Sequence, residues 1–175
     1  MDIKKKEKVY DGYFKMFEVT VQQDGHTFTR EQFDRGNAVA AIVYDTEKDH
    51  FILTRQYRIG SESALVEVVA GMIDKGEEPS QSIAREINEE IGYHVDKVEH
   101  LYTFYSSPGG CTEKVELYYV EVSDQEHEGG GNAHEHEKIE LVKLSKEEFM
   151  QLVSPDAKTI IAQQWIRLKQ HNQIK

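Results

Sequence analysis

Apolar and polar residues alternate along the first part of the chain in a way that predicts strands. From about Tyr10 to Arg35 this alternation runs on both sides of Gln23-Asp24-Gly25-His26. An Asp-Gly pair between two such stretches is typical of a β-hairpin turn. Two strands alone cannot bury a core. We therefore expect residues 1–36 to form an N-terminal β-hairpin arm of the same folding unit, and residues 37–175 to form the domain proper.

Short apolar stretches in the rest of the chain predict strands around one interposed helix, which favours a mixed α/β or α+β sandwich. "AVAAIVY" and "FILTRQYR" flank Asp45–His50 and predict a second hairpin. Four more stretches read as strands: "ALVEVVA" (Ala64–Ala70), "VEHLYTFY", "KVELYYVEV" and "IELVKL".

The interposed helix lies within "GMIDKGEEPSQSIAREINEEIGY". Pro79 suits its first turn and Gly92 its C-terminal end. Isoleucines at positions 83, 87 and 91 recur every four residues and predict a buried stripe. At about 100° per residue, Glu86 and Glu90 fall together beside this stripe. Glu89 lies on the outer flank of the pair.

The C-terminal part of the chain reads as helical. Ser145-Lys146-Glu147-Glu148 is a capping-box pattern that opens one helix. Ser154-Pro155-Asp156 predicts the start of a longer helix, with the proline in its first position. There Ile161, Trp165 and Leu168 repeat at helical spacing, so we expect them to face the core. Ser123–Lys138 is rich in Gly, His and Glu and reads as a loop.

The composition narrows the classes of partner. A net charge of −11 argues against general affinity for nucleic acid or an anionic membrane, because no basic tract offsets it. No apolar run approaches the roughly 20 residues that a membrane-spanning helix needs. Met1–Lys6 has no apolar stretch behind its basic residues, so we expect no secretory signal. The single cysteine, Cys111, fits a reducing cytoplasm.

The carboxylates of the helix point to a cation. Glu86 and Glu90 are one turn apart, and on an exposed helix such a pair repels by about a few tenths of a kcal/mol. Mg²⁺ takes oxygen ligands and typically binds one or two carboxylates together with substrate phosphates. We therefore interpret the pair as half of a divalent-metal site. A solvated acidic face is the alternative. Arg85 precedes Glu89 by four residues and can reach it.

The spacing of these residues resembles the Nudix box. Gly71, Glu77 and the run Arg85–Tyr93 fill every defining position of that motif, including the apolar Ile87. The resemblance implies an α/β/α sandwich with a mixed sheet and a hydrolase of nucleoside diphosphates linked to another group.

The resemblance also implies roles for individual residues. Glu86 and Glu90 would bind Mg²⁺, for which Mn²⁺ can substitute, and the backbone carbonyl of Ala70 would complete a metal site. Glu89 would be a further ligand or the catalytic base. Arg85 would hold the glutamates, and Glu77 would contact Arg85.

Residues outside the box resemble the group of Nudix enzymes that cleaves ADP-ribose and nucleotide sugars. "TRQYR" before "ALVEVVAGMID" and "SSPGGCTE" (Ser106–Glu113) carry this likeness. "FDRGNAVAAIVYD", "GGGNAHEHEKIELVKL" and "DAKT" are similar to the branch that cleaves GDP-mannose.

By position, this likeness implies a homodimer in which Tyr13, Arg30 and Glu31 contact the nucleotide or sugar, partly across the dimer interface. Arg58 would grip the pyrophosphate or base, Glu113 the sugar and Lys158 a phosphate. Glu137 would join the metals or act as base. The substrate-binding residues would then be Tyr13, Arg30, Glu31, Arg58, Gly71, Met72, Glu113, His136 and Lys158.

Two departures from that branch lie at substrate-facing positions. His136 stands where an acid is usual, and Ala157 replaces a glycine before Lys158. The loop histidines at 127, 134 and 136 could also form a transition-metal site, although a solvated loop with one catalytic glutamate fits phosphate chemistry better. ADP-ribose is the alternative substrate. The alternatives from other classes are a nucleotide-sugar sensor without turnover and a purely structural interaction domain.

Overall fold

The structure is a computed structural model, which describes residues 1–131 and 138–171. The chain forms two compact units. One comprises Met1–Ala38 with Thr103–Val115, and the other comprises Val39–Tyr102 with Glu116–Lys175. Two long strands, β8 (Tyr93–Tyr105) and β9 (Lys114–Gln125), have residues in both units.

The first unit contains an antiparallel sheet of β1 (Asp2–Asp11), β2 (Lys15–Gln23) and β3 (His26–Asp34), in that order. The predicted hairpin is β2–β3, and Asp24 and Gly25 make its turn with φ of 51° and 79°. Two consecutive positive φ values fit the right-handed twist of a hairpin, and Asp-Gly tolerates them. The end of β3 also pairs with the loop between β8 and β9, through a bridge between Phe33 and Cys111.

The predicted hairpin is extended by a third strand, β1, which was not predicted. Its sequence, "DIKKKEKVYD", is mostly charged, and every residue in it is exposed. Hydrophobic alternation therefore could not identify it. The strand exists through its backbone register with β2, from Asp2 opposite Gln22 to Asp11 opposite Lys15.

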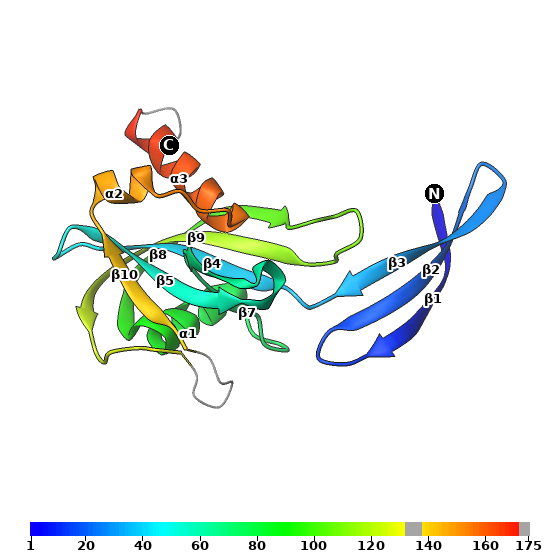
Figure 1. The fold of residues 1–175 in the computed structure, drawn as a ribbon, viewed down its shortest axis with the longest axis horizontal. Helices are drawn as coiled ribbons and strands as arrows, with labels where there is room; N and C mark the ends of the chain where they lie inside the picture. The colour runs from blue at the N-terminus through cyan, green and yellow to red at the C-terminus, as the bar shows by residue number, and fades with distance from the viewer. Residues whose placement is uncertain (132–137, 172–175) are drawn as a thin grey trace. The chain divides into compact units, whose positions relative to one another are not determined.

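The second unit is built on a sheet of seven described strands (Figure 1). The central order is β10-β5-β4-β9-β8, with β6 paired to β5 and β7 paired to β4. The predicted hairpin around Asp45–His50 is confirmed as β4–β5. "ALVEVVA" forms two strands instead of one, because the chain leaves the β5 edge at Val68 and continues beside β4. The strands not yet bounded are β4 (Ala38–Asp45), β5 (His50–Arg58), β6 (Ser63–Glu67), β7 (Val69–Met72) and β10 (Glu140–Leu144), and a 3-10 turn, η1, spans Ile59–Ser61.

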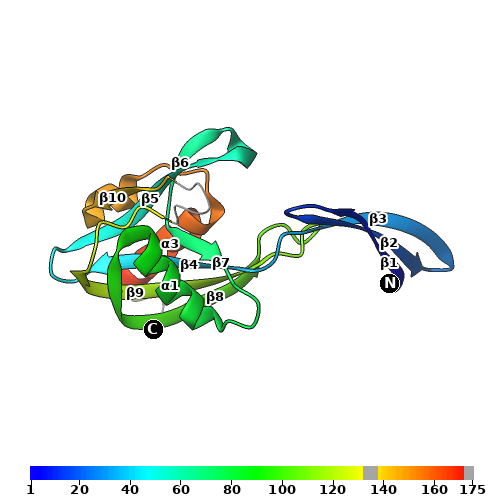
Figure 2. The ribbon, with the colours of Figure 1, turned by 90° about the horizontal axis from the view of Figure 1, so that it is seen from below.

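Helix α1 (Pro79–Ile91) covers one face of this sheet, and Figure 2 shows it in front of the strands when seen from below. Its isoleucines at 83, 87 and 91 are fully buried, as the spacing predicted. They pack against odd-numbered residues of β4, which are Val39, Ala41 and Val43, and even-numbered residues of β9, which are Tyr118, Val120 and Val122. The apolar stripe thus fixes the rotation of α1, and with it the direction of the glutamates beside the stripe.

Helices α2 (Lys146–Gln151) and α3 (Ala157–Gln170) cover the opposite face (Figure 1), so the predicted α/β/α sandwich with a mixed sheet is confirmed. Phe51 of β5 packs against Phe149 of α2, and Tyr119 of β9 packs against Trp165 of α3. The predicted capping box at Ser145 is present.

The start of α3 differs from the prediction. Asp156 is the N-cap residue, because its carboxylate accepts a hydrogen bond from the Thr159 N–H at 2.9 Å. Pro155 therefore precedes the helix. The buried face is also centred one residue later than expected. Ala162, Trp165 and Ile166 are buried, whereas the predicted core residues Ile161 and Leu168 are half-buried. Within the described part of the chain, no helix is long and apolar enough to cross a membrane.

Candidate active site

The carboxylates of the candidate site are presented by α1, whose ends form as predicted. Pro79 occupies the first turn, and Gly92 ends the helix with φ 75°, where its N–H donates to the carbonyls of Ile87 and Asn88. Glu90 is only 4% exposed, and the Glu86 side chain is 12% exposed. A carboxylate buried to this degree must be compensated by hydrogen bonds or positive charge.

Gly71 of β7 lies directly against the Glu86 carboxylate. A Cβ built on Gly71 would overlap the Cδ and both carboxylate oxygens of Glu86. Only a residue without a side chain therefore allows this strand to lie so close to α1 with the Glu86 carboxylate in its observed place. As a result, the backbone around Ala70 and Gly71 and the Glu86 carboxylate share one small space.

Arg85 ties the loop before α1 to the glutamates of the helix. Its Nε and Nη2 donate to the two oxygens of Glu77 at 3.2 and 3.1 Å. Its Nη1 donates to Glu86 at 2.8 Å and to Glu89 at 3.2 Å, and Nη2 also donates to the Met72 carbonyl at 3.1 Å. Such a planar guanidinium fixes direction as well as charge. Arg85 thus holds three carboxylates and the end of β7 in one arrangement.

The pKa of Glu77 is strongly lowered in this network. Hydrogen bonds from Arg85, and then from the hydroxyl of buried Ser82 at 2.5 Å, lower the pKa of Glu77 to about 2. In return, Glu77 and then Glu86 raise the pKa of Arg85, against the effect of its burial. Glu77 and Arg85 are therefore both charged at neutral pH.

Glu86 and Glu90 supply oxygen ligands that suit a hard divalent cation, but in the part of the chain that the structure describes they do not belong to a preformed cage of protein ligands. Among the residues that the structure describes, no three His, Cys, Asp or Glu side chains come together as a ligand group. Two carboxylates and nearby backbone oxygens are nonetheless the donor set of a cation that keeps waters and binds substrate phosphates. The tight fit of Gly71 against Glu86 leaves the backbone of β7 beside those oxygens.

Two predicted substrate residues, Arg58 and Lys158, come together in the second unit around a carboxylate that the sequence analysis missed. Arg58 Nε lies 2.7 Å from Glu67 Oε1, and Lys158 Nζ lies 3.1 Å from Glu67 Oε2. Lys158 also contacts Asp156 at 2.6 Å. A signal for Glu67 was present, because it is the one charged residue in the apolar run "ALVEVVA".

The other predicted substrate residues with described positions belong to the first unit. Tyr13 is 86% exposed beside Phe14, and Arg30 and Glu31 are exposed on β3. Glu113 is 7% exposed and forms an ion pair with Arg35 at 3.1 Å. This pairing was not predicted from the sequence. His134, Glu135, His136 and Glu137 lie outside the described residues.

Comparison with known proteins identifies the family. The family model named NUDIX domain matches residues 34–164. The chain belongs to the NUDIX domain family. Members of this family generally use divalent metal ions. The prediction of a Nudix hydrolase is thereby confirmed.

Two relatives are similar to the chain along most of its length, and one solved structure shares its fold. It is 33% identical to GDP-mannose pyrophosphatase of Cronobacter sakazakii, with 91% of each chain covered. It is 34% identical to GDP-mannose pyrophosphatase of Escherichia coli K12, with 86% of each chain covered. A crystal structure of an ADP compounds hydrolase, 24% identical, superposes with a TM-score of 0.81 over 99% of this chain and 96% of that one. This last likeness supports the fold.

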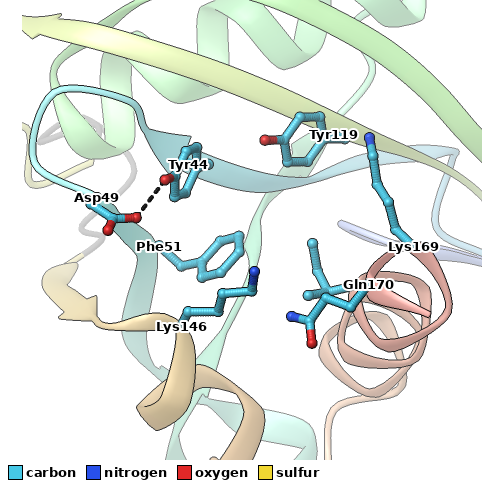
Figure 3. Close-up of a pocket in the computed structure, with 8 residues that line it drawn as sticks. Tyr44, Asp49, Phe51, Tyr119, Lys146, Lys169 and Gln170 are labelled. Carbon is cyan, nitrogen blue, oxygen red and sulfur yellow. Dashed lines mark hydrogen bonds between the residues drawn. The ribbon is translucent and has the colours of Figure 1, made fainter. Parts of the chain in front are cut away.

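A depression of about 360 Å³ lies elsewhere on the Nudix fold, against the face covered by α2 and α3. In Figure 3 the Tyr44 hydroxyl donates to Asp49 at 2.5 Å, and Phe51 and Tyr119 line the same space. Neither Arg85 nor any carboxylate that it holds lines it. We therefore assign the candidate active site from the chemistry around α1.

Gly71→Ala should abolish activity without unfolding the protein. The added methyl group would displace the flexible end of Glu86, which costs little stability but removes the carboxylate from its place. Gly60→Ala is the matched control, since nothing lies within 4 Å of a Cβ there and its φ is not positive. Thermal denaturation and hydrolysis rates should show native-like melting of both variants and loss of activity only for Gly71→Ala. Full activity of that variant would contradict the close approach.

The Glu77–Arg85 ion pair should make the stability of the protein depend on pH in the acid range. The folded-state pKa of Glu77, about 2, lies below the ordinary glutamate pKa of 4.5. Its stabilisation is therefore fully present above about pH 4.5 and is lost as pH falls through about 2. The difference in urea midpoint between the wild type and Glu77→Gln should be largest near pH 6 and should shrink toward pH 2. A difference that does not change with pH would show that charge is not its source.

Proposed function

We propose that the protein catalyses Mg²⁺-dependent hydrolysis of the pyrophosphate of a nucleoside diphosphate sugar resembling GDP-mannose. The products would be a nucleoside monophosphate and a sugar 1-phosphate. The observation that carries the reaction class is the pair of carboxylates one turn apart on α1. Glu90 is buried, and the largely buried Glu86 lies against the side-chain-free backbone of Gly71. Solvated carboxylates would not require this close approach.

Arg85, Glu86 and Glu90 of α1 have different roles in this proposal. Glu86 and Glu90, with the Ala70 carbonyl, would hold the cation, and Glu137 would join them. A divalent cation bound there would neutralise the pyrophosphate oxygens and lower the pKa of a bound water. Arg85 would keep Glu86 directed toward β7 through its 2.8 Å contact.

The reaction itself is a displacement at phosphorus. Glu137, or failing that Glu89, would accept a proton from the attacking water. The new P–O bond would form opposite the bridging oxygen, whose bond to that phosphorus breaks, and this oxygen would leave with the other phosphate. Such a reaction depends mainly on positioning and charge neutralisation.

The substrate class is supported by the relatives. Both GDP-mannose pyrophosphatases match the chain along most of its length. Arg58 and Lys158 supply positive charge on the second unit for phosphate groups. Gly71, Met72 and His136 complete the proposed substrate contacts, together with Glu113 for the sugar. ADP-ribose is the alternative substrate, and a sensor without turnover is the alternative from a different class.

We also propose that the protein is a homodimer assembled through its N-terminal sheet. The exposed strand β1 carries the apolar residues Ile3, Val9 and Tyr10, each at least 60% exposed. Light scattering should give the mass of two chains. The mass of one chain at micromolar concentration would contradict this proposal.

The substrate is tested by a product-resolved assay. GDP-mannose, ADP-ribose, ADP-glucose and a diadenosine polyphosphate are each incubated with the protein and Mg²⁺, and the products are separated by chromatography. We expect GMP and mannose 1-phosphate to form fastest. AMP and ribose 5-phosphate as the preferred products would favour the alternative substrate. Tight binding without turnover of any compound would favour the sensor.

Glu86→Gln and Glu90→Gln should each lower kcat by about two orders of magnitude or more, because each removes one negative ligand from the cation. Glu47→Gln, an exposed glutamate in the β4–β5 turn, is the control. Circular dichroism should be unchanged in all three variants. A wild-type rate in either α1 variant would refute the metal assignment.

A further inference from the structure

Arg58 and Lys158 are distant in sequence, but both contact Glu67. Arg58 ends β5, Glu67 ends β6, and Lys158 lies in the first turn of α3. Arg58 is bidentate, with Nε 2.7 Å from Oε1 and Nη2 3.3 Å from Oε2 of Glu67. Lys158 Nζ reaches the same Oε2 at 3.1 Å. One carboxylate therefore joins two cations that come from opposite ends of the domain sequence.

The charges of this cluster are arranged in layers. Glu67 is 3% exposed, whereas the side chains of Lys158 and Arg58 are 20% and 34% exposed. A buried carboxylate is costly unless cations and hydrogen bonds compensate it. Here the negative charge lies inside and the two positive charges lie toward solvent. An anion that approaches this surface therefore meets the cations first.

Hydrogen bonds between the backbone on both sides of Glu67 and side-chain hydroxyls hold the start of α3 in place. The Ser154 hydroxyl donates to the Val66 carbonyl at 3.0 Å, and the Val68 N–H donates to the Thr159 hydroxyl oxygen at 3.0 Å. The residues immediately before and after Glu67 are thus both bonded to the segment that carries Lys158. This pairing sets the register between β6 and the start of α3.

Asp156 is the second anchor of Lys158 and also caps α3. Its Oδ1 lies 2.6 Å from Lys158 Nζ, and its Oδ2 accepts from the Thr159 N–H at 2.9 Å and hydroxyl at 2.7 Å. Burial acts to raise the pKa of Asp156, but Lys158 and Thr159 outweigh it, so the pKa is lowered. The helix cap therefore restricts the lysine to one position.

We propose that Glu67 is a positioning residue that makes Arg58 and Lys158 a single binding unit for the paired phosphates of the substrate. This inference rests on the proposed function, in which these two residues bind phosphate. Glu67 itself does not touch the substrate. It sets the spacing and direction of the two cations, so that neither has to be ordered when the pyrophosphate binds.

Kinetic constants distinguish a positioning role for Glu67 from a merely structural one. Glu67→Gln keeps the volume of the side chain but removes its charge and places an amide N–H₂ against cationic donors. We expect KM to rise about tenfold or more, as for loss of a charged hydrogen bond, while kcat stays within about threefold. The control is Glu121→Gln, which breaks a Glu–Lys pair of 3.1 Å with Lys97 outside this cluster. A drop in kcat with unchanged KM would overturn the proposal.

A mutant cycle tests whether Glu67 acts through the cations. The change in KM caused by Glu67→Gln is measured in the wild type and in the Arg58→Met/Lys158→Met variant. We expect the effect to disappear in the second background, because interacting residues are not additive. The same multiple of KM in both backgrounds would overturn the proposal. If Glu67→Gln does not fold, Arg58→Lys and Lys158→Met are compared singly and together, and additive effects would then overturn it.

Binding of inorganic pyrophosphate in EDTA separates this inference from the proposed function. Calorimetry on the full chain needs no turnover. We expect the wild type to bind pyrophosphate, Glu67→Gln to bind it about tenfold more weakly, and Glu121→Gln to bind it like the wild type. If no nucleotide sugar is hydrolysed but this order holds, the proposed function fails and the binding unit stands. Equal binding by all three proteins, or none by the wild type, would overturn the inference.

Discussion

The arrangement of the site depends on one guanidinium. Arg85 contacts the loop before α1, the helix itself and the end of β7, and so it fixes their positions relative to one another. Without that positive charge, the carboxylates of Glu77, Glu86 and Glu89 would repel one another more strongly. With it, their mutual repulsion is reduced before any ligand arrives, and the direction of Glu86 is set by a short charged hydrogen bond.

Packing and electrostatics reinforce each other at this point. The three isoleucines fix the rotation of α1 on the sheet, and Gly71 fixes how closely β7 approaches it. Neither would suffice alone. A correctly rotated helix at a greater distance would leave the backbone of β7 out of reach of Glu86, and a close strand beside a rotated helix would meet a different side chain. The site therefore depends on contacts made by residues that carry no charge.

Local patterns in the sequence predicted much of this structure. Periodicity and end signals gave α1 with its caps, the capping box at Ser145, and the Asp-Gly turn of β2–β3, because each depends on neighbours in the chain. The charged strand β1 could not be found in this way, since only pairing with β2 makes it a strand. The meeting of Arg58 and Lys158 on Glu67 depends on tertiary packing of α3. Spacing alone could not give it, although a buried charge in an apolar strand was a usable signal.

The loop between β8 and β9 forms backbone hydrogen bonds with the end of β3. The Phe33 N–H donates to the Gly110 carbonyl at 2.7 Å, and the Thr112 N–H donates to the Phe33 carbonyl at 3.0 Å. A truncation at residue 38 would thus leave backbone groups of a distant hairpin without their partners. The two compact units are not interchangeable modules. Grafting the N-terminal sheet onto another member of the family would require transfer of residues 103–115 with it.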